Sequence, residues 1–287
     1  MRDAEMGLNI HDLIGGPVNH RFIPVEGAQI HLAEAGSGAP LILLHGLNIG
    51  WLQWYPNIAA LAKRYHVFAF DLPGAGESTV VDFTRLDPER MLVNTIDACL
   101  RTLGINDVTI VGHSLGAWVA MRLLNRGSLS IRRLILTNPF GFSDFTPPLY
   151  RMLASEKMAR LLATTMMSPS DAHLRKFFEM VVRRRSTISS ALIGQYAANI
   201  AAAPETHPFY LIHRLTGFRK VRPEFILDRS ALTALQGEVI FGEYDPIVPP
   251  VTVPENVAPQ VRRHVIRGVG HVPNIESADE WNAIVCS

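Results

Sequence analysis

The chain has 287 residues, of which 48% are hydrophobic and 18% are charged, with 27 basic and 26 acidic side chains. This balance predicts no field that would hold nucleic acid or an anionic membrane, so we expect a small-molecule partner. No charge-free run reaches the ~18 residues of a membrane span. Cys99 and Cys286 fit no disulfide or metal-ligand spacing, which indicates reduced thiols in a soluble, cytoplasmic protein. The oligomeric state stays open.

Short apolar runs predict the strands of a sheet. Residues 21–25 and 29–35 alternate polar and apolar side chains around a glycine turn, which predicts an antiparallel pair. Later runs are unbroken, as is typical of strands buried on both faces of a parallel sheet, at residues 40–44, 66–70, 108–111, 134–136, 238–241 and 263–266. The expected fold is α/β, with a doubly wound, mostly parallel, eight-stranded sheet.

Helices separate the central strands. One begins at Asp87, which caps its first turn, ends at Gly104 and carries Cys99 on its buried face. Another extends from Ser114 to about Arg126, and helical crossovers of this kind join parallel strands.

Residues 141–225 have no strand signal and are rich in Met, Leu, Arg and Ala, which predicts a helical cap. The core is then formed by residues 21–140 and 226–287, and residues 1–20 are an N-terminal extension. A capping box of Ser277 and Glu280 predicts a final helix. Three arginines at residues 183–185 are interpreted as a solvated helix face, with an anionic substrate group as the alternative.

Residues 112–116 read GHSLG and lie between a predicted strand and a predicted helix, the context in which G-x-S-x-G indicates a nucleophile elbow. The abrupt turn strains its central residue, and only neighbours without side chains let the elements pack closely. Ser114 is therefore the predicted nucleophile.

A serine nucleophile needs a base, and the base needs an acid to orient it. His271 follows the last strand in a loop, and the order Ser, acid, His along the chain is met. Asp245 is the predicted acid because Pro246 constrains its turn. Glu243 is its local rival and Asp144 a distant one. Other histidines have plainer interpretations: His66 opens a strand, His173, His207 and His213 fall in the insertion, and His11 and His20 precede the fold.

The backbone amides of Leu47 and Leu115 are the predicted oxyanion donors, because one loop follows an early strand and the other follows the nucleophile. His45 is expected to hold the first loop by hydrogen bonds. Glycines at residues 36–38 and 74–76 do not complete a dinucleotide motif, and the sequence has no zinc or phosphate-loop motif. We expect neither a cofactor nor a metal.

Five motifs together carry a resemblance: HG at residues 45–46, DLPGAGES at 71–78, the elbow, FGEYD at 241–245 and GH at 270–271. Residues 21–285 resemble the α/β-hydrolase superfamily, and in particular the single-domain serine hydrolases with a helical cap in the esterase, lactonase and C–C hydrolase branch. The resemblance disfavours dehalogenase and epoxide hydrolase activity, since those enzymes have Asp where this chain has Ser114.

The function we expect is cleavage of a small or medium apolar carboxylic ester through an acyl-serine. The alternatives are a C–C or lactone hydrolase with the same triad and, in another class, a ligand receptor without catalysis. Apolar side chains in and before the cap either line an acyl pocket or belong to the core: Phe140, Phe142, Phe145, Met152, Met166, Met167, Phe177 and Phe178.

Overall fold

The structure is a computed structural model that describes residues 13–85, 87–235, 237–253 and 260–287. One eight-stranded sheet has the order β1-β2-β4-β3-β5-β6-β7-β8. Strands β1 and β4 pair with β2 antiparallel, and all other neighbours are parallel. The predicted fold class is confirmed. The strands are β1 Asn19–Val25, β2 Ala28–Ala35, β3 Ala39–Leu44, β4 Tyr65–Phe70, β5 Asp107–His113, β6 Ser130–Thr137, β7 Glu238–Gly242 and β8 Arg262–Ile266.

The first strand begins earlier than predicted. β1 starts at Asn19 and pairs His20 with Ala33, so the placement of His20 before the fold was wrong. Of the predicted extension, residues 1–12 lie outside the described residues, and residues 13–18 precede β1. β6 is also longer than its apolar run, because Arg133 lies within the strand and its Nε donates to Glu238 Oε1 of β7 at 2.6 Å.

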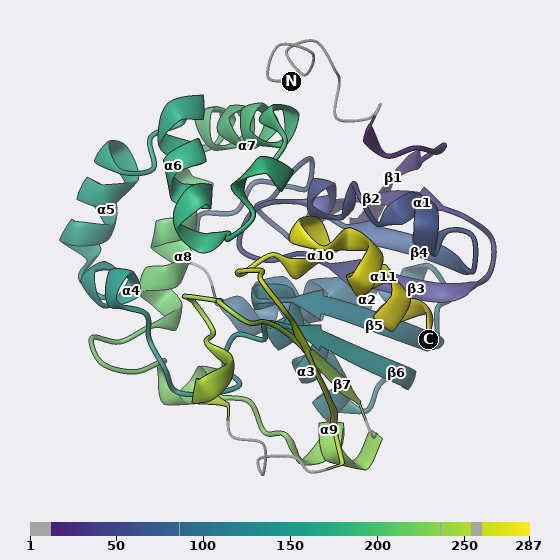
Figure 1. Cartoon of the computed structure of the whole chain (residues 1–287). Coiled ribbons are helices and arrows are strands. Elements are labelled where there is room, and N and C mark those ends of the chain that lie inside the picture. The colour runs from purple at the N-terminus through teal and green to yellow at the C-terminus, as the bar shows by residue number, and fades with distance from the viewer. Residues whose placement is uncertain (1–12, 86, 236, 254–259) are drawn as a thin grey trace.

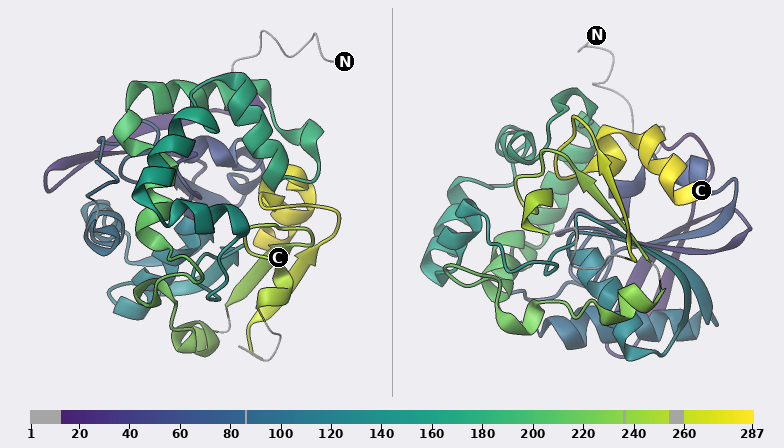
Figure 2. Two further views of the ribbon diagram at one scale, coloured as in Figure 1. Left: turned by 90° about the vertical axis from the view of Figure 1, so that its left-hand side faces the viewer. Right: turned by 60° about the horizontal axis from the view of Figure 1, so that its bottom comes forward.

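Two layers of helices cover the sheet (Figures 1 and 2). One layer holds η3 Glu89–Asn94, α2 Thr95–Thr102, α3 Leu115–Arg126 and α9 Ser230–Leu235; the other holds α1 Ile58–Leu61, α10 Pro273–Glu276 and α11 Ala278–Cys286. Asp87 accepts hydrogen bonds from the amides of Glu89 and Arg90, as expected of a cap. Cys99 is fully buried on α2, and burial raises the pKa of its thiol to about 12, so the thiol is inert.

The capping box at the last helix differs from the prediction. The Ser277 hydroxyl donates to Glu280 Oε2 at 3.3 Å, while the Ser277 amide already donates to Pro273 O of α10 at 2.9 Å. Because α10 uses that amide, Glu280 accepts from no backbone amide within the described residues, and α11 begins without a side-chain cap.

Five α-helices between β6 and α9 form what we call the helical segment, residues 148–215, seen beside the sheet at the left of Figure 1. They are α4 Pro148–Leu153, α5 Glu156–Thr165, α6 Asp171–Val181, α7 Ser190–Ala202 and α8 Pro208–Leu215. Helix α8 packs on α4 and α5, and α6 packs on α7. They bury their own apolar side chains, including Leu153, Ala159, Leu174, Ile193 and Phe209.

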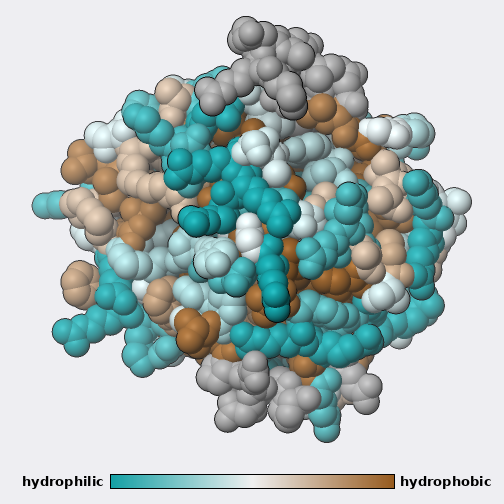
Figure 3. All heavy atoms as spheres, viewed as in Figure 1, coloured by the Kyte–Doolittle hydropathy of each residue, from teal (hydrophilic) through white to brown (hydrophobic). Residues whose placement is uncertain are grey.

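The surface in Figure 3 mixes hydrophilic and hydrophobic side chains over the helical segment and the sheet layers alike. Among the described residues, no helix combines the length and the apolar character that a membrane crossing requires.

Helix α3 packs directly onto the strands behind it. A Cβ at Gly116 would lie 2.1 Å from Leu44 O, and a Cβ at Gly112 would lie 2.5 Å from Gly116 O. Backbone atoms cannot yield as a flexible side chain can. Both glycines of the elbow are therefore required by close packing, as the sequence pattern predicts.

We predict that Gly116→Ala lowers the free energy of unfolding by about 1–3 kcal/mol, because the added methyl overpacks a rigid contact. Gly194 on α7 is the matched control, since a Cβ there meets nothing within 4 Å. Gly194→Ala should raise the free energy of unfolding by about 0.5–1 kcal/mol through its helix propensity. Urea denaturation of both variants measures the contrast, and equal effects would contradict it.

Candidate active site

Ser114 occupies the turn between β5 and α3. Its backbone has φ 50° and ψ −111°, a strained conformation for a residue with a side chain. The surrounding backbone holds it there: the Ser114 amide donates to Thr137 O at 2.9 Å, and Ser114 O accepts from the Phe140 amide at 3.2 Å. The side chain is 8% exposed and lines a small cavity.

His271 and Asp245 meet across the ends of β8 and β7. His271 Nδ1 donates to Asp245 Oδ2 at 2.8 Å, and Asp245 is 3% exposed. Asp245 Oδ1 accepts from the amides of Ile247 and Val248 at 2.7 and 3.0 Å, in the turn that Pro246 constrains. Both oxygens of the Asp245 carboxylate therefore accept hydrogen bonds. The bond to Nδ1 leaves His271 Nε2 with its lone pair.

The loop of His271 also lies against the elbow. The ring of His113, next to Ser114, is 4.8 Å from the ring of His271, and His113 Nε2 donates to His271 O at 2.7 Å. Burial, with the nearby His271, holds the pKa of His113 well below its usual range, so His113 stays neutral. Within the described residues, no hydrogen bond joins Ser114 to the His271 ring.

The rival acids lie elsewhere. Glu243 is exposed and accepts from the Gly268 amide at 2.9 Å. Asp144 is paired with Lys220 at the surface. Neither contacts His271. Four other histidines that the structure describes form hydrogen bonds elsewhere: His66 with Glu34, His173 with Ser168 and Ser170, His207 with Met167 O, and His213 with Leu153 O.

The loop after β3 faces Ser114. Leu47 and Leu115 line the same cavity as Ser114, and the amide of neither has an acceptor among the described residues. His45 is fully buried behind this loop, where Nδ1 donates to Gly46 O and Nε2 accepts from the Leu72 amide at 2.9 Å. Burial lowers the pKa of His45 and keeps its ring neutral. His45 therefore holds the loop, as expected.

Sequence reasoning missed Asn138. This residue has φ 43° and is fully buried at the end of β6. Its Nδ2 donates to His271 O at 2.8 Å, and its Oδ1 accepts from the Gly242 amide at 3.0 Å. Asn138 thus connects β6, β7 and the His271 loop. Asn tolerates a positive φ better than most residues, and an Asn directly after a buried strand was the available signal.

Glu276 was missed as well. It is 2% exposed, and its Oε2 accepts from the amides of Arg183 and Arg184 at 2.7 and 2.9 Å. Its Oε1 accepts from the Gly270 amide at 2.9 Å, beside His271. The carboxylate therefore ties the turn after α6 to the His271 loop. No local pattern predicts this role, because Arg183 and Arg184 lie 93 and 92 residues from Glu276 along the chain.

The arginine run at residues 183–185 is not a helix face, so that interpretation was wrong. Arg183 and Arg184 follow α6, which ends at Val181, and their amides turn toward Glu276. The Arg183 guanidinium lies 5.3 Å from the centre of the Tyr244 ring. A cavity of about 530 Å³ opens here and contains neither Ser114 nor His271.

The cavity at Ser114 is small and apolar, with a free volume of about 20 Å³. Its lining is Leu47, Ser114, Leu115, Phe140, Tyr150, Ile212, Leu215 and Thr216. A second cavity of about 10 Å³ shares Phe140, Tyr150 and Thr216. Burial, with the nearby Asp245 carboxylate, raises the pKa of Tyr150, so its hydroxyl remains a donor. Within the described residues, that hydroxyl has no hydrogen-bond partner.

Few of the side chains predicted for an acyl pocket are there. Phe140 lines the cavity at Ser114, and Phe145 lines the neighbouring one. Phe142, Met167 and Phe178 are buried in the core, whereas Met152 is 48% exposed. Periodicity alone cannot separate a lining position from a core position, because both are apolar.

Comparison with known proteins decides the family. The model of the alpha/beta hydrolase family matches residues 41–284. The chain belongs to the alpha/beta hydrolase family. Its fold and relatives are those of hydrolases, so the protein is an enzyme of this family.

Two curated relatives of this hydrolase differ in how much they share with it. The (E)-2-((N-methylformamido)methylene)succinate hydrolase of Acinetobacter baylyi is 37% identical over 92 residues, 31% of this chain and 33% of that protein. The 2-hydroxy-6-oxononadienedioate/2-hydroxy-6-oxononatrienedioate hydrolase of Comamonas testosteroni is 28% identical over 270 residues, 89% of each. Both relatives act on small molecules.

Solved structures share the fold of this hydrolase. The 2-hydroxy-6-oxo-6-phenylhexa-2,4-dienoate hydrolase of a Rhodococcus species superimposes with a TM-score of 0.76 at 22% identity, covering 94% of this chain and 97% of its own. A lipase-like protein of Acinetobacter baumannii, described as a putative lipase, gives 0.76 at 19% identity, covering 96% and 92%.

Proposed function

We propose that this hydrolase cleaves a small or medium apolar carboxylic ester through an acyl-serine. The observation that carries the proposal is the placement of Ser114 at a strained strand-to-helix turn, against a loop in which His271 donates to Asp245 at 2.8 Å. Ser114 is the proposed nucleophile, His271 the base and Asp245 the acid that orients it.

The chemistry proceeds in two halves. Ser114 Oγ attacks the ester carbonyl carbon while His271 Nε2 takes the hydroxyl proton. The carbonyl oxygen gains negative charge, and the amides of Leu47 and Leu115 are the proposed donors to it. His271 then gives its proton to the departing alcohol, which leaves an acyl-serine. A water molecule then attacks the acyl-serine by the same steps, with His271 as the base, and the carboxylic acid product is released. Asp245 stays ionised and stabilises the His271 imidazolium.

The lining of the cavity supports an apolar, uncharged substrate. Among the residues that the structure describes, no cationic side chain lines the cavity at Ser114. A substrate carboxylate there would lose its water without gaining a counter-ion, which is costly.

Tyr150, Ile212 and Leu215 belong to α4 and α8. We therefore propose that the helical segment acts as the cap and selects the substrate. A free volume of about 20 Å³ also means that side chains must move to admit an acyl group.

A second candidate is C–C bond hydrolysis with the same triad. The observation that favours it is the 28% identity, over 89% of each chain, to the dienedioate hydrolase of Comamonas testosteroni. Rates on neutral esters, lactones and a vinylogous diketone acid separate the candidates. Faster cleavage of the diketone acid would replace the ester proposal.

Loss of the nucleophile tests the proposal directly. Ser114→Ala should abolish labelling by an organophosphonate and nearly all turnover, while the fold survives because one hydroxyl leaves no core cavity. Intact mass spectrometry measures labelling, and circular dichroism verifies the fold. A wild-type protein that takes no label would favour a ligand receptor, and an active Ser114→Ala variant would remove Ser114 from the mechanism.

Asp245 and Glu243 form a matched pair of carboxylates two residues apart. Asp245→Asn should lower kcat by a factor of about 10³–10⁴, since an amide cannot hold the required His271 tautomer. Glu243→Gln should change kcat only a few-fold, because the exposed Glu243 accepts from the Gly268 amide and makes no hydrogen bond or ion pair with His271 in the described part of the chain. Steady-state rates on one ester suffice. The opposite ranking would assign the acid to Glu243.

Tyr150→Phe tests selection by the helical segment. Loss of the free hydroxyl should lower kcat/KM about tenfold for esters with a hydrogen-bond acceptor on the acyl chain, and spare plain alkyl esters. Tyr196→Phe is the control, because Tyr196 is buried beside Phe178 and lines neither cavity. An unchanged substrate ranking in Tyr150→Phe would shift selection to the loop after β3.

A further inference from the structure

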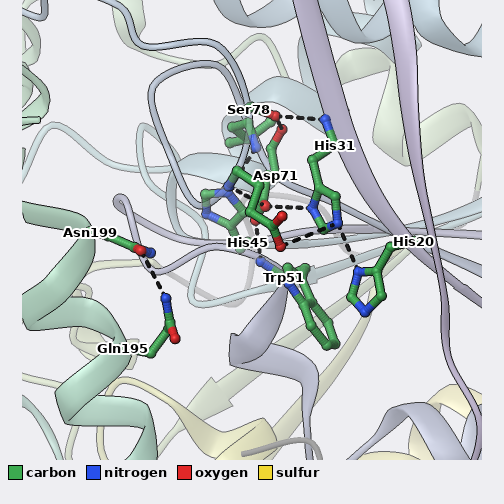
Figure 4. Close-up of polar contacts among 10 residues, drawn as sticks. His20, His31, His45, Trp51, Asp71, Ser78, Gln195 and Asn199 are labelled. Carbon is green, nitrogen blue, oxygen red and sulfur yellow. Dashed lines mark hydrogen bonds and ion pairs between the residues drawn. The ribbon is translucent and has the colours of Figure 1, made fainter. Parts of the chain in front are cut away.

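A cluster outside the proposed active site brings together two imidazoles and a carboxylate. His20 lies on β1, His31 on β2, and Glu77 in the loop after β4. Their ligand atoms all lie within 4.8 Å of one another. His31 Nε2 is 2.9 Å from His20 Nδ1 and 3.7 Å from Glu77 Oε1. Figure 4 shows the His31 ring between Asp71 on one side and His20 on the other.

The buried side of the cluster sets the tautomer of His31. His31 Nδ1 donates to Asp71 Oδ2 at 2.7 Å, and both side chains are fully buried. The other bonds of Asp71 come from the amides of Trp51 and Glu77, at 2.6 and 3.0 Å. Asp71 is therefore held by three donors, one of which is the His31 ring. With its proton on Nδ1, His31 directs the Nε2 lone pair toward His20 and Glu77.

This arrangement leaves negative charge facing a lone pair. The Glu77 carboxylate lies 3.7 Å from His31 Nε2, and His20 Nδ1 lies 2.9 Å from the same nitrogen. A cation that prefers imidazole nitrogen and carboxylate oxygen can bind all three groups and offset the negative charge of Glu77.

We propose that His20, His31 and Glu77 bind a divalent transition-metal ion of the zinc class. Zinc takes imidazole and carboxylate ligands at about 2.0–2.2 Å, which puts tetrahedral ligand atoms about 3.3–3.5 Å apart. The distances of 2.9 and 3.7 Å bracket that spacing, so small rotations of the exposed His20 and Glu77 side chains complete the site. Asp71 bound to Nδ1 is the outer carboxylate that orients metal-ligating histidines elsewhere.

The bound ion would stabilise the fold by cross-linking separate segments of the chain. It joins β1 and β2 to the loop of residues 71–78, and Asp71 extends the connection to the loop after β3 through the Trp51 amide. The sequence has no zinc motif because its ligands come from positions 20, 31 and 77, which only strand pairing brings together.

Zinc titration at pH 8 tests the site. The whole chain is used without a polyhistidine tag, after a chelator has removed any bound metal. We expect one Zn²⁺ per chain by competition with a chromogenic chelator, and a higher Tm on zinc addition. His20→Asn and Glu77→Gln should each weaken binding at least tenfold and remove the Tm increase. Co²⁺ in the same site should give the visible absorption of a four-coordinate ion.

His66→Asn is the matched control, since His66 also faces a carboxylate, Glu34, at 2.6 Å and belongs to no such cluster. This variant should bind zinc as the wild type does, and circular dichroism shows that each variant is folded. Absence of stoichiometric zinc binding, or equal binding by all three variants, would overturn the proposal and leave the cluster as a hydrogen-bond network.

Discussion

The direct contact between α3 and the strands behind it is the constraint on which the site depends. Gly112 and Gly116 let the helix approach until a Cβ at Gly116 would be 2.1 Å from Leu44 O. That approach forces Ser114 to φ 50°, and bonds to Thr137 O and from the Phe140 amide keep it there. The strain is stored in the best-buried part of the sheet, where packing can sustain it.

Buried polar groups transmit this order to the His271 loop. His113 and Asn138 both donate to His271 O, while the His271 amide donates to Val181 O at the end of α6. Glu276 joins the same loop to Arg183 and Arg184. The turn after α6 is thus attached to the loop of the proposed catalytic histidine. A second attachment lies between α7 and α8, where Asn48 of the loop after β3 donates to Thr206 O at 2.9 Å. The cavity-lining helices α4 and α8 lie outside the stretch between these two attachments.

Two buried carboxylates, Glu276 and Asp71, hold the loops around the proposed active site. Glu276 receives backbone amides around His271, and Asp71 receives amides and a histidine below the loop after β3. Both oxygens of each carboxylate have hydrogen-bond donors, which offsets the cost of burial. The proposed oxyanion loop and the proposed base are therefore positioned by charges that do not touch the cavity at Ser114.

The sequence by itself determined the sheet, the elbow and the three proposed catalytic side chains. These depend on local signals: apolar runs, a G-x-S-x-G turn, and loops that follow strands. Only the tertiary structure decided that Glu276 clamps the His271 loop, that Tyr150 rather than Met152 or Phe178 lines the cavity, and that His20 belongs to β1 and meets His31 and Glu77. Contacts between residues far apart in the chain leave no periodic pattern. Each of these side chains has its role because of a spatial neighbour that lies far away along the sequence.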